Sequence, residues 1–304
     1  MKTRLAIFVA ALLLLPLAGL FLSGGAWGEL AVNAATATDE TLTPTLRTSL
    51  MLLFYVLLVN HTVKRLTGNS PFSTQRNYFI GMSIASALLG WLLSYLNLFV
   101  ASWSVAQDNS VPVQILLYTP LFALLAPAVL VTRALLAVFP GVLKFLAFHA
   151  AFTPAGGETL TFILLPLALL GLLGGASWTA QLFWLFWLAP LLLLLALQIL
   201  WNESTIFSGL KSGDWGRIIC TAFAGIMVGN LAVATYQMNA SLRINLSSPL
   251  LAQAGFALFG LVCLQLGDVI AENWRGKSRS SLFTQKKKFP IPVVVKKVDD
   301  RREW

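Results

Sequence analysis

Charged residues are scarce in this 304-residue chain. Asp, Glu, Lys and Arg make up 11% of it, whereas 57% of its residues are hydrophobic and its mean hydropathy is +0.78. A soluble fold of this length needs a charged outer shell, so the composition excludes ordinary soluble domains. Continuous apolar runs of about 20 residues recur, which is the length of one helical bilayer crossing and not the alternation of a β-barrel. The expected fold class is all-α, a polytopic integral membrane protein.

Reactive residues and ligand-binding motifs are also few. The chain has two cysteines, Cys220 and Cys263, and two histidines. Both cysteines fall in apolar segments, which favours small core residues over a disulfide. No histidine lies at a metal-ligand spacing, and a GxSxG nucleophile motif, a phosphate loop and a dinucleotide fingerprint are all missing from the sequence. We therefore expect no metal, no cofactor and no catalytic residue of these classes.

Eight apolar segments are long enough to span a bilayer. The first resembles a signal peptide but lacks a clean cleavage site, so we expect it to be retained. The fourth contains Pro120 and Pro127, which predict a kink. Residues 134–157 are too short and too charged for two more crossings; we expect the fourth helix to overrun, followed by a short interfacial helix. The predicted spans are residues 5–24, 46–63, 78–103, 111–132, 158–178, 182–201, 218–238 and 249–270.

The distribution of Lys and Arg predicts the orientation. With the N-terminus inside and eight spans, 19 of the 21 Lys and Arg residues lie on the cytoplasmic side, and Arg47 and Arg243 lie outside. Both termini are then cytoplasmic, and the expected location is a bacterial inner membrane. Asn60 and Asn202 end the second and sixth spans, where asparagine tolerates a left-handed conformation.

Short matches suggest an internal duplication. LLPLA occurs at residues 14–18 and again at 164–168, and GGA at 24–26 and again at 174–176, both at the same spacing. Four spans followed by four spans in the same orientation would form a parallel repeat, a common plan among transporters. The alternative is coincidence among leucine, glycine and proline.

A group of polar residues is predicted to lie at the cytoplasmic interface. Asp268 falls inside an apolar span, where a charge costs at least a few kcal/mol unless it is paired or hydrated. Asp268 and Glu272 share a helix face because they are four residues apart. We expect Asp268 to pair with a cation from another helix, Arg133 first and otherwise His61 or Lys64. The candidate cluster is His61, Arg133, His149, Glu203, Gln265, Asp268 and Glu272.

This cluster has two interpretations. It is either a small site for a cation, a proton or a lipid headgroup, or a set of interhelical bonds that fix the packing. The tail, residues 276–304, is basic and has its own two readings: a segment held to anionic inner-leaflet lipid, or a docking strand for a protein partner. Because the positive charges lie at membrane edges and in this tail, the net charge of +9 does not call for a nucleic-acid partner.

Three functional classes remain, in this order. The first is a non-catalytic membrane subunit or scaffold of an envelope complex, which a tightly filled core would favour. The second is a permease with a site between two four-helix halves, which a hydrated mid-membrane cavity would favour. The third is a membrane-embedded enzyme acting on a lipid or lipid-linked substrate at the cytoplasmic face, which an open cleft lined by His61, Glu203 and Asp268 would favour.

Overall fold

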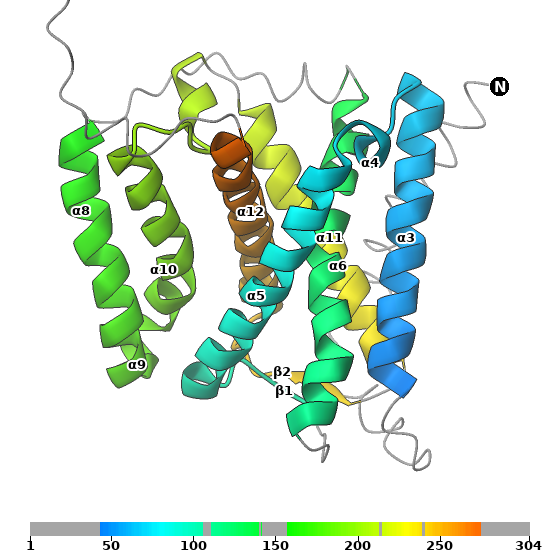
Figure 1. Ribbon diagram of the computed structural model, residues 1–304. Coiled ribbons are helices and arrows are strands. Elements are labelled where there is room, and N and C mark those ends of the chain that lie inside the picture. Colours follow the sequence, from blue (N-terminus) through cyan, green and yellow to red (C-terminus); the bar gives the residue numbers. More distant parts are fainter. Residues whose placement is uncertain are drawn as a thin grey trace, which may run out of the picture.

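The computed structural model describes residues 43–105, 111–139, 141, 157–212, 215–238 and 241–274, which are almost wholly helical (Figure 1). Within them, seven helices are long and apolar enough to cross a membrane. This agrees with the expected class of polytopic helical membrane protein. These long helices are α3 (Thr43–Thr67), α5 (Arg76–Val100), α6 (Val111–Ala137), α8 (Gly157–Leu169) with the π-helical η1 (Leu170–Gly174) and α9 (Gly175–Ser177), α10 (Thr179–Leu200), α11 (Gly216–Gln237) and α12 (Pro249–Trp274). The shorter elements are α4 (Pro71–Thr74), the 3-10 helix η2 (Ser208–Ser212), and strands β1 (Trp103–Val105) and β2 (Leu242–Ile244).

The helices begin and end within about five residues of seven of the predicted spans, and one of the differences has a visible cause. The third span was expected to reach Trp103, but α5 ends at Val100 because Ala101 adopts a left-handed conformation with φ of 50°, and Trp103 starts β1. Helix α6 includes both prolines and continues to Ala137. The first predicted span (5–24), the interfacial helix expected after α6 and the basic tail lie outside the described residues.

The helices pack around a closely filled centre. Helix α5 packs along α6, and α11 packs along α12; α3 lies on α6, and α8 lies on α10 (Figure 1). Contacts between α6 and α11 join the α5–α6 pair to the α11–α12 pair, and contacts between α10 and α12 join α8 and α10 to the rest. The outward faces stay apolar, as with Leu98 and Phe162, which are 78% and 79% exposed, because lipid tails are as apolar as leucine. The main hydrophobic core includes fully buried side chains of α3, α6 and α11: Val56, Val59, Ala126, Ala128, Val129, Val131, Ala224 and Val228.

A short antiparallel ribbon of β1 and β2 lies at one end of the bundle, and α4 lies at the other (Figure 1). In the ribbon Ser104 lies opposite Arg243. The two strands are reached in the same way. At the end of α5, Asn97 donates from Nδ2 to the Trp103 carbonyl at 2.8 Å; at the end of α11, Gln237 donates from Nε2 to the Leu242 carbonyl at 3.0 Å. We call the two ends of the bundle the ribbon end and the α4 end.

The α5–α6 and α11–α12 pairs also share a glycine–phenylalanine contact. A Cβ on Gly90 would overlap the ring of Phe122, and a Cβ on Gly229 would overlap the ring of Phe256. Both helix pairs therefore need a glycine at this position, because any side chain there would push the neighbouring ring away.

A polar contact repeats next to that glycine. Trp91 on α5 donates from Nε1 to Thr119 Oγ1 on α6 at 3.0 Å. Asn230 on α11 exchanges two hydrogen bonds with Gln253 on α12, at 2.7 and 3.0 Å. The number of residues from Gly90 to Gly229 equals the number from Trp91 to Asn230. The number from Phe122 to Phe256 likewise equals the number from Thr119 to Gln253.

Candidate functional site

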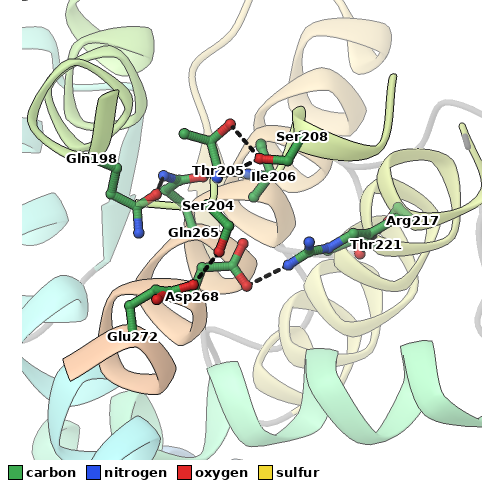
Figure 2. A network of polar contacts seen from close by, with 10 residues as sticks. All are labelled: Gln198, Ser204, Thr205, Ile206, Ser208, Arg217, Thr221, Gln265, Asp268 and Glu272. Atoms are coloured by element: carbon green, nitrogen blue, oxygen red, sulfur yellow. Dashed lines mark hydrogen bonds and ion pairs between the residues drawn. The ribbon is translucent and has the colours of Figure 1, made fainter. Parts of the chain in front are cut away.

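Polar side chains gather at the α4 end, where α11 begins and where α10 and α12 end. Figure 2 shows this network, which links the last turns of α12 to the first turn of α11 and to the loop after α10. Helices α10 and α12 pack against each other and end at the same side, so the loop that follows α10 lies close to the end of α12. Three contacts build the network, each from a residue of α12.

The first contact is an ion pair between helices. Asp268 Oδ1 accepts a charge-assisted hydrogen bond from Arg217 Nη2 (Figure 2). The side chains are 14% and 26% exposed, so the pair is only partly screened by solvent. Thr221, one turn further along α11, donates from Oγ1 to the Arg217 carbonyl at 2.7 Å.

Asp268 therefore pairs with a cation from another helix, but the expected partner was wrong. The cation is Arg217, and neither Arg133, His61 nor Lys64 bonds to Asp268. The physical reason is the packing of α12 along α11, which places the first turn of α11 beside the last turns of α12. A signal for this was present in the sequence, since helices joined by a short loop are usually antiparallel neighbours.

The second contact is a pair of buried amides. Gln198 near the end of α10 and Gln265 on α12 are both fully buried, and their amides contact each other. Gln265 Oε1 also accepts the backbone N–H of Ile206 at 3.1 Å. One α12 side chain therefore holds both α10 and the loop that follows it.

The third contact closes the same loop. Ser204 donates from its hydroxyl to Glu272 Oε1, and Glu272 is 2% exposed.

Asn202 has the left-handed conformation expected of it, with φ of 53°. Asn60 does not: it lies inside α3, and its side-chain oxygen accepts the Phe72 N–H at 3.3 Å.

Beside the network lies a cavity of about 1030 Å³. Arg133, near the end of α6, is half-buried in its wall and makes no hydrogen bond or ion pair with any described residue. Asp268 forms part of the α12 wall, and its second oxygen, Oδ2, has no hydrogen-bond partner in the described part of the chain. The other lining residues are Pro71, Ser73, Thr74, Gln75, Arg76, Asn77, Tyr78, Phe79, Leu130, Ala134 and Ala271.

The remaining predicted site residues are not brought together. His61 is exposed on α3, where its Nε2 accepts from Arg65 Nε at 3.0 Å. Glu203 is half-buried in the loop, and its backbone N–H donates to the Gln198 carbonyl at 2.9 Å. His149 lies outside the described residues. The structure thus joins Gln265, Asp268 and Glu272 through partners that sequence reasoning missed: Arg217, Gln198 and Ser204.

No group of three or more His, Cys, Asp or Glu side chains in the described ranges is placed to hold a metal ion. Neither a protein family, nor a curated protein, nor a solved structure matches this chain. Its function must therefore be inferred from the geometry of its own residues.

Proposed function

We propose that this chain is a non-catalytic, multi-pass inner-membrane protein that serves as a subunit or scaffold of an envelope complex. One observation carries the proposal: the polar side chains of α12 bond to other segments of the same chain. Asp268, Gln265 and Glu272 each have such a partner. A polar group used in this way fixes how helices pack and is less free to bind and release a substrate.

The energetics agree with a structural role. Hydrogen bonds between membrane helices contribute about 0.6–2 kcal/mol each, and removing one partner leaves the other unsatisfied in apolar surroundings. Three such links hold α10, α11 and the loop after α10 to one helix. The centre formed by α3, α6 and α11 is filled with buried aliphatic side chains. A scaffold needs this kind of single, rigid arrangement.

The charge distribution supports the proposed orientation. In the described residues Arg47 and Arg243 lie at the ribbon end, and the other cations with defined side chains lie toward the α4 end. By the positive-inside rule the α4 end is then cytoplasmic. The cations at the α4 end are Lys64, Arg65, Arg76, Arg133 and Arg217.

The repeated contacts support a parallel four-plus-four duplication. The pairs Gly90–Phe122 and Gly229–Phe256, the two polar contacts beside them and the symmetric ribbon all recur at matching sequence spacings. Repeated side-chain contacts are stronger support for a duplication than short matches within leucine-rich segments. We propose that α5–α6 corresponds to α11–α12, with α3 corresponding to α10.

This repeat favours a permease as the second candidate, because many transporters bind substrate between two repeats. The cavity is shallow, however: its innermost lining residues, Leu130, Phe79 and Asp268, lie within about two turns of the helix ends. A permease needs a path to the bilayer midplane, where this bundle is filled. The enzyme ranks third, since His61 and Glu203 do not line the cavity.

The scaffold proposal is tested by extracting the full chain in mild detergent and measuring its mass by native mass spectrometry. We expect a defined protein partner in stoichiometric amount, and loss of that partner when residues 276–304 are deleted. A matched control replaces Lys286, Lys287 and Lys288 by Gln and retains the rest of the tail, which separates docking from attraction to lipid. A chain that runs without a protein partner in every case contradicts the proposal.

A further inference from the structure

We propose that the cavity at the α4 end binds the phosphate group of a membrane lipid headgroup, with Arg133 as the central ligand. This binding is independent of whether the chain acts as a scaffold or a permease. The cavity lies between α4, the first turn of α5, the end of α6 and the end of α12. The scaffold proposal gives the residues that line this cavity no ligand-binding role.

The state of Arg133 is the first reason. Its guanidinium is half-buried at the wall of the cavity and has no hydrogen bond or ion pair with a described residue, although it carries five N–H donors. A buried cation whose N–H donors lack acceptors is costly, even where a carboxylate lies within electrostatic reach, as Asp268 does here. A phosphate satisfies it well, because two of its oxygens match the planar fork of the guanidinium.

The opposite wall supplies further donors. Helix α5 has 25 residues and begins at Arg76, and its first turn forms part of the cavity wall. The N-terminus of a helix carries partial positive charge and exposed N–H groups, both of which favour a phosphate. Arg76, Gln75 and Asn77 are exposed at the rim, where each side chain is able to reach a ligand.

The charge balance favours an anion in spite of Asp268. This carboxylate lines the cavity, but its charge is offset by the ion pair with Arg217, which lies behind it. Arg133 also interacts electrostatically with Asp268 without a hydrogen bond between them. One carboxylate of the cavity wall thus faces three cations, Arg133, Arg76 and Arg217, and positive charge is in excess around the space.

The position of the cavity identifies the ligand as a lipid. The helices that line it end at this level, which is the level of headgroups if the α4 end is a membrane surface. Apolar side chains, Phe79, Leu130, Ala134 and Ala271, line it together with the polar ones, so that one ligand meets both kinds of surface. Its volume of about 1030 Å³ is sufficient for a headgroup with its glycerol.

The test uses the full chain in detergent, with thermal stability measured against added lipid. Phosphatidylglycerol is expected to raise the melting temperature and to be retained in native mass spectra. Arg133→Gln and Arg76→Gln are each expected to weaken its apparent affinity about tenfold, the effect of one lost charge-assisted interaction. Arg65→Gln is the matched control: Arg65 is an exposed cation at the same end, outside the cavity lining, and its removal should leave the affinity unchanged.

Two further probes decide the source and the nature of the ligand. Diacylglycerol, which lacks the phosphate, should give no shift; an equal shift overturns the proposal, because binding would then depend on acyl chains alone. Inorganic phosphate should act only weakly, and an effect as strong as that of the lipid overturns the assignment to a lipid. If Arg133→Gln does not fold, Arg133→Lys and the rim variant Arg76→Gln replace it, and wild-type affinity in both contradicts the proposal.

Discussion

Gly225 and Gly260 bring the backbones of α11 and α12 into direct contact. A Cβ built on Gly225 would lie 2.8 Å from the Cα of Gly260, and one built on Gly260 would lie 2.9 Å from the Cα of Gly225. The corresponding positions of α5 and α6 are Ser86 and Ala126. There the Ser86 hydroxyl accepts the Ala126 N–H at 3.0 Å and donates to the Phe122 carbonyl. The same crossing is thus closed by bare backbone in one pair and by a bridging hydroxyl in the other.

Replacing Gly225 by Val is expected to separate α11 from α12 and to destabilise the protein by about 3 kcal/mol or more, because backbone and not a flexible side chain occupies the space. Thermal unfolding in detergent measures this. Gly255→Val is the control on α12, since a Cβ there meets nothing within 4 Å. Equal stability of the two variants would show that the close contact does not form.

Ser86→Ala is expected to cost about 1–3 kcal/mol. The hydroxyl accepts the Ala126 N–H and donates to the Phe122 carbonyl, so the substitution removes both hydrogen bonds between α5 and α6 at this crossing. Ser94→Ala on the same helix serves as the control, because the Ser94 hydroxyl bonds only the Gly90 carbonyl of its own helix, at 2.9 Å. The difference in melting temperature between the two variants measures the effect, and no difference would contradict it.

Arg217→Gln and Asp268→Asn are each expected to destabilise the chain by about 1–3 kcal/mol. The value is below that for a fully buried pair, because both side chains are partly exposed. The double variant should lose much less than the sum of the single losses. Stabilities measured for all four members of the double-mutant cycle provide the coupling energy. Additive losses would mean that the two side chains do not interact.

A disulfide between Ser104→Cys and Arg243→Cys is the first part of a test that distinguishes a scaffold from a permease. These residues lie opposite each other in the ribbon, where Cα atoms are about 4.5–5.5 Å apart, within the range that a disulfide spans. We expect the bond to form in oxidant without loss of stability, because the ribbon is already closed.

Solvent access to Asn230→Cys completes that comparison, in a background with Cys220 and Cys263 replaced by Ala. Asn230 is 3% exposed between α11 and α12. A scaffold keeps it closed to a membrane-impermeant maleimide from either side, with or without the ribbon disulfide. A permease predicts a different result. The maleimide would label Asn230→Cys from the outside, and the ribbon disulfide would abolish this labelling because it prevents the two halves from opening.

The sequence by itself determined the class of fold and the positions of the seven long apolar helices. Long apolar runs have one stable form in a bilayer, since a helix satisfies its own backbone hydrogen bonds, and so seven helices fall where hydropathy places them. The need of Asp268 for a cation also followed from the sequence, because a lone charge among apolar residues is costly.

Only the tertiary structure decided which residues meet. From the sequence, Arg133 was expected first as the partner of Asp268, and Arg217 was not among the named candidates. The packing of α12 along α11 selects Arg217 and leaves Arg133 at the cavity wall. The turn at Ala101 into β1 was likewise not visible, because its hydrogen bonds reach a strand far away in the chain. Helix formation depends on bonds within one segment, whereas pairing depends on which faces pack together, and that is set by side-chain fits such as Gly225 against Gly260.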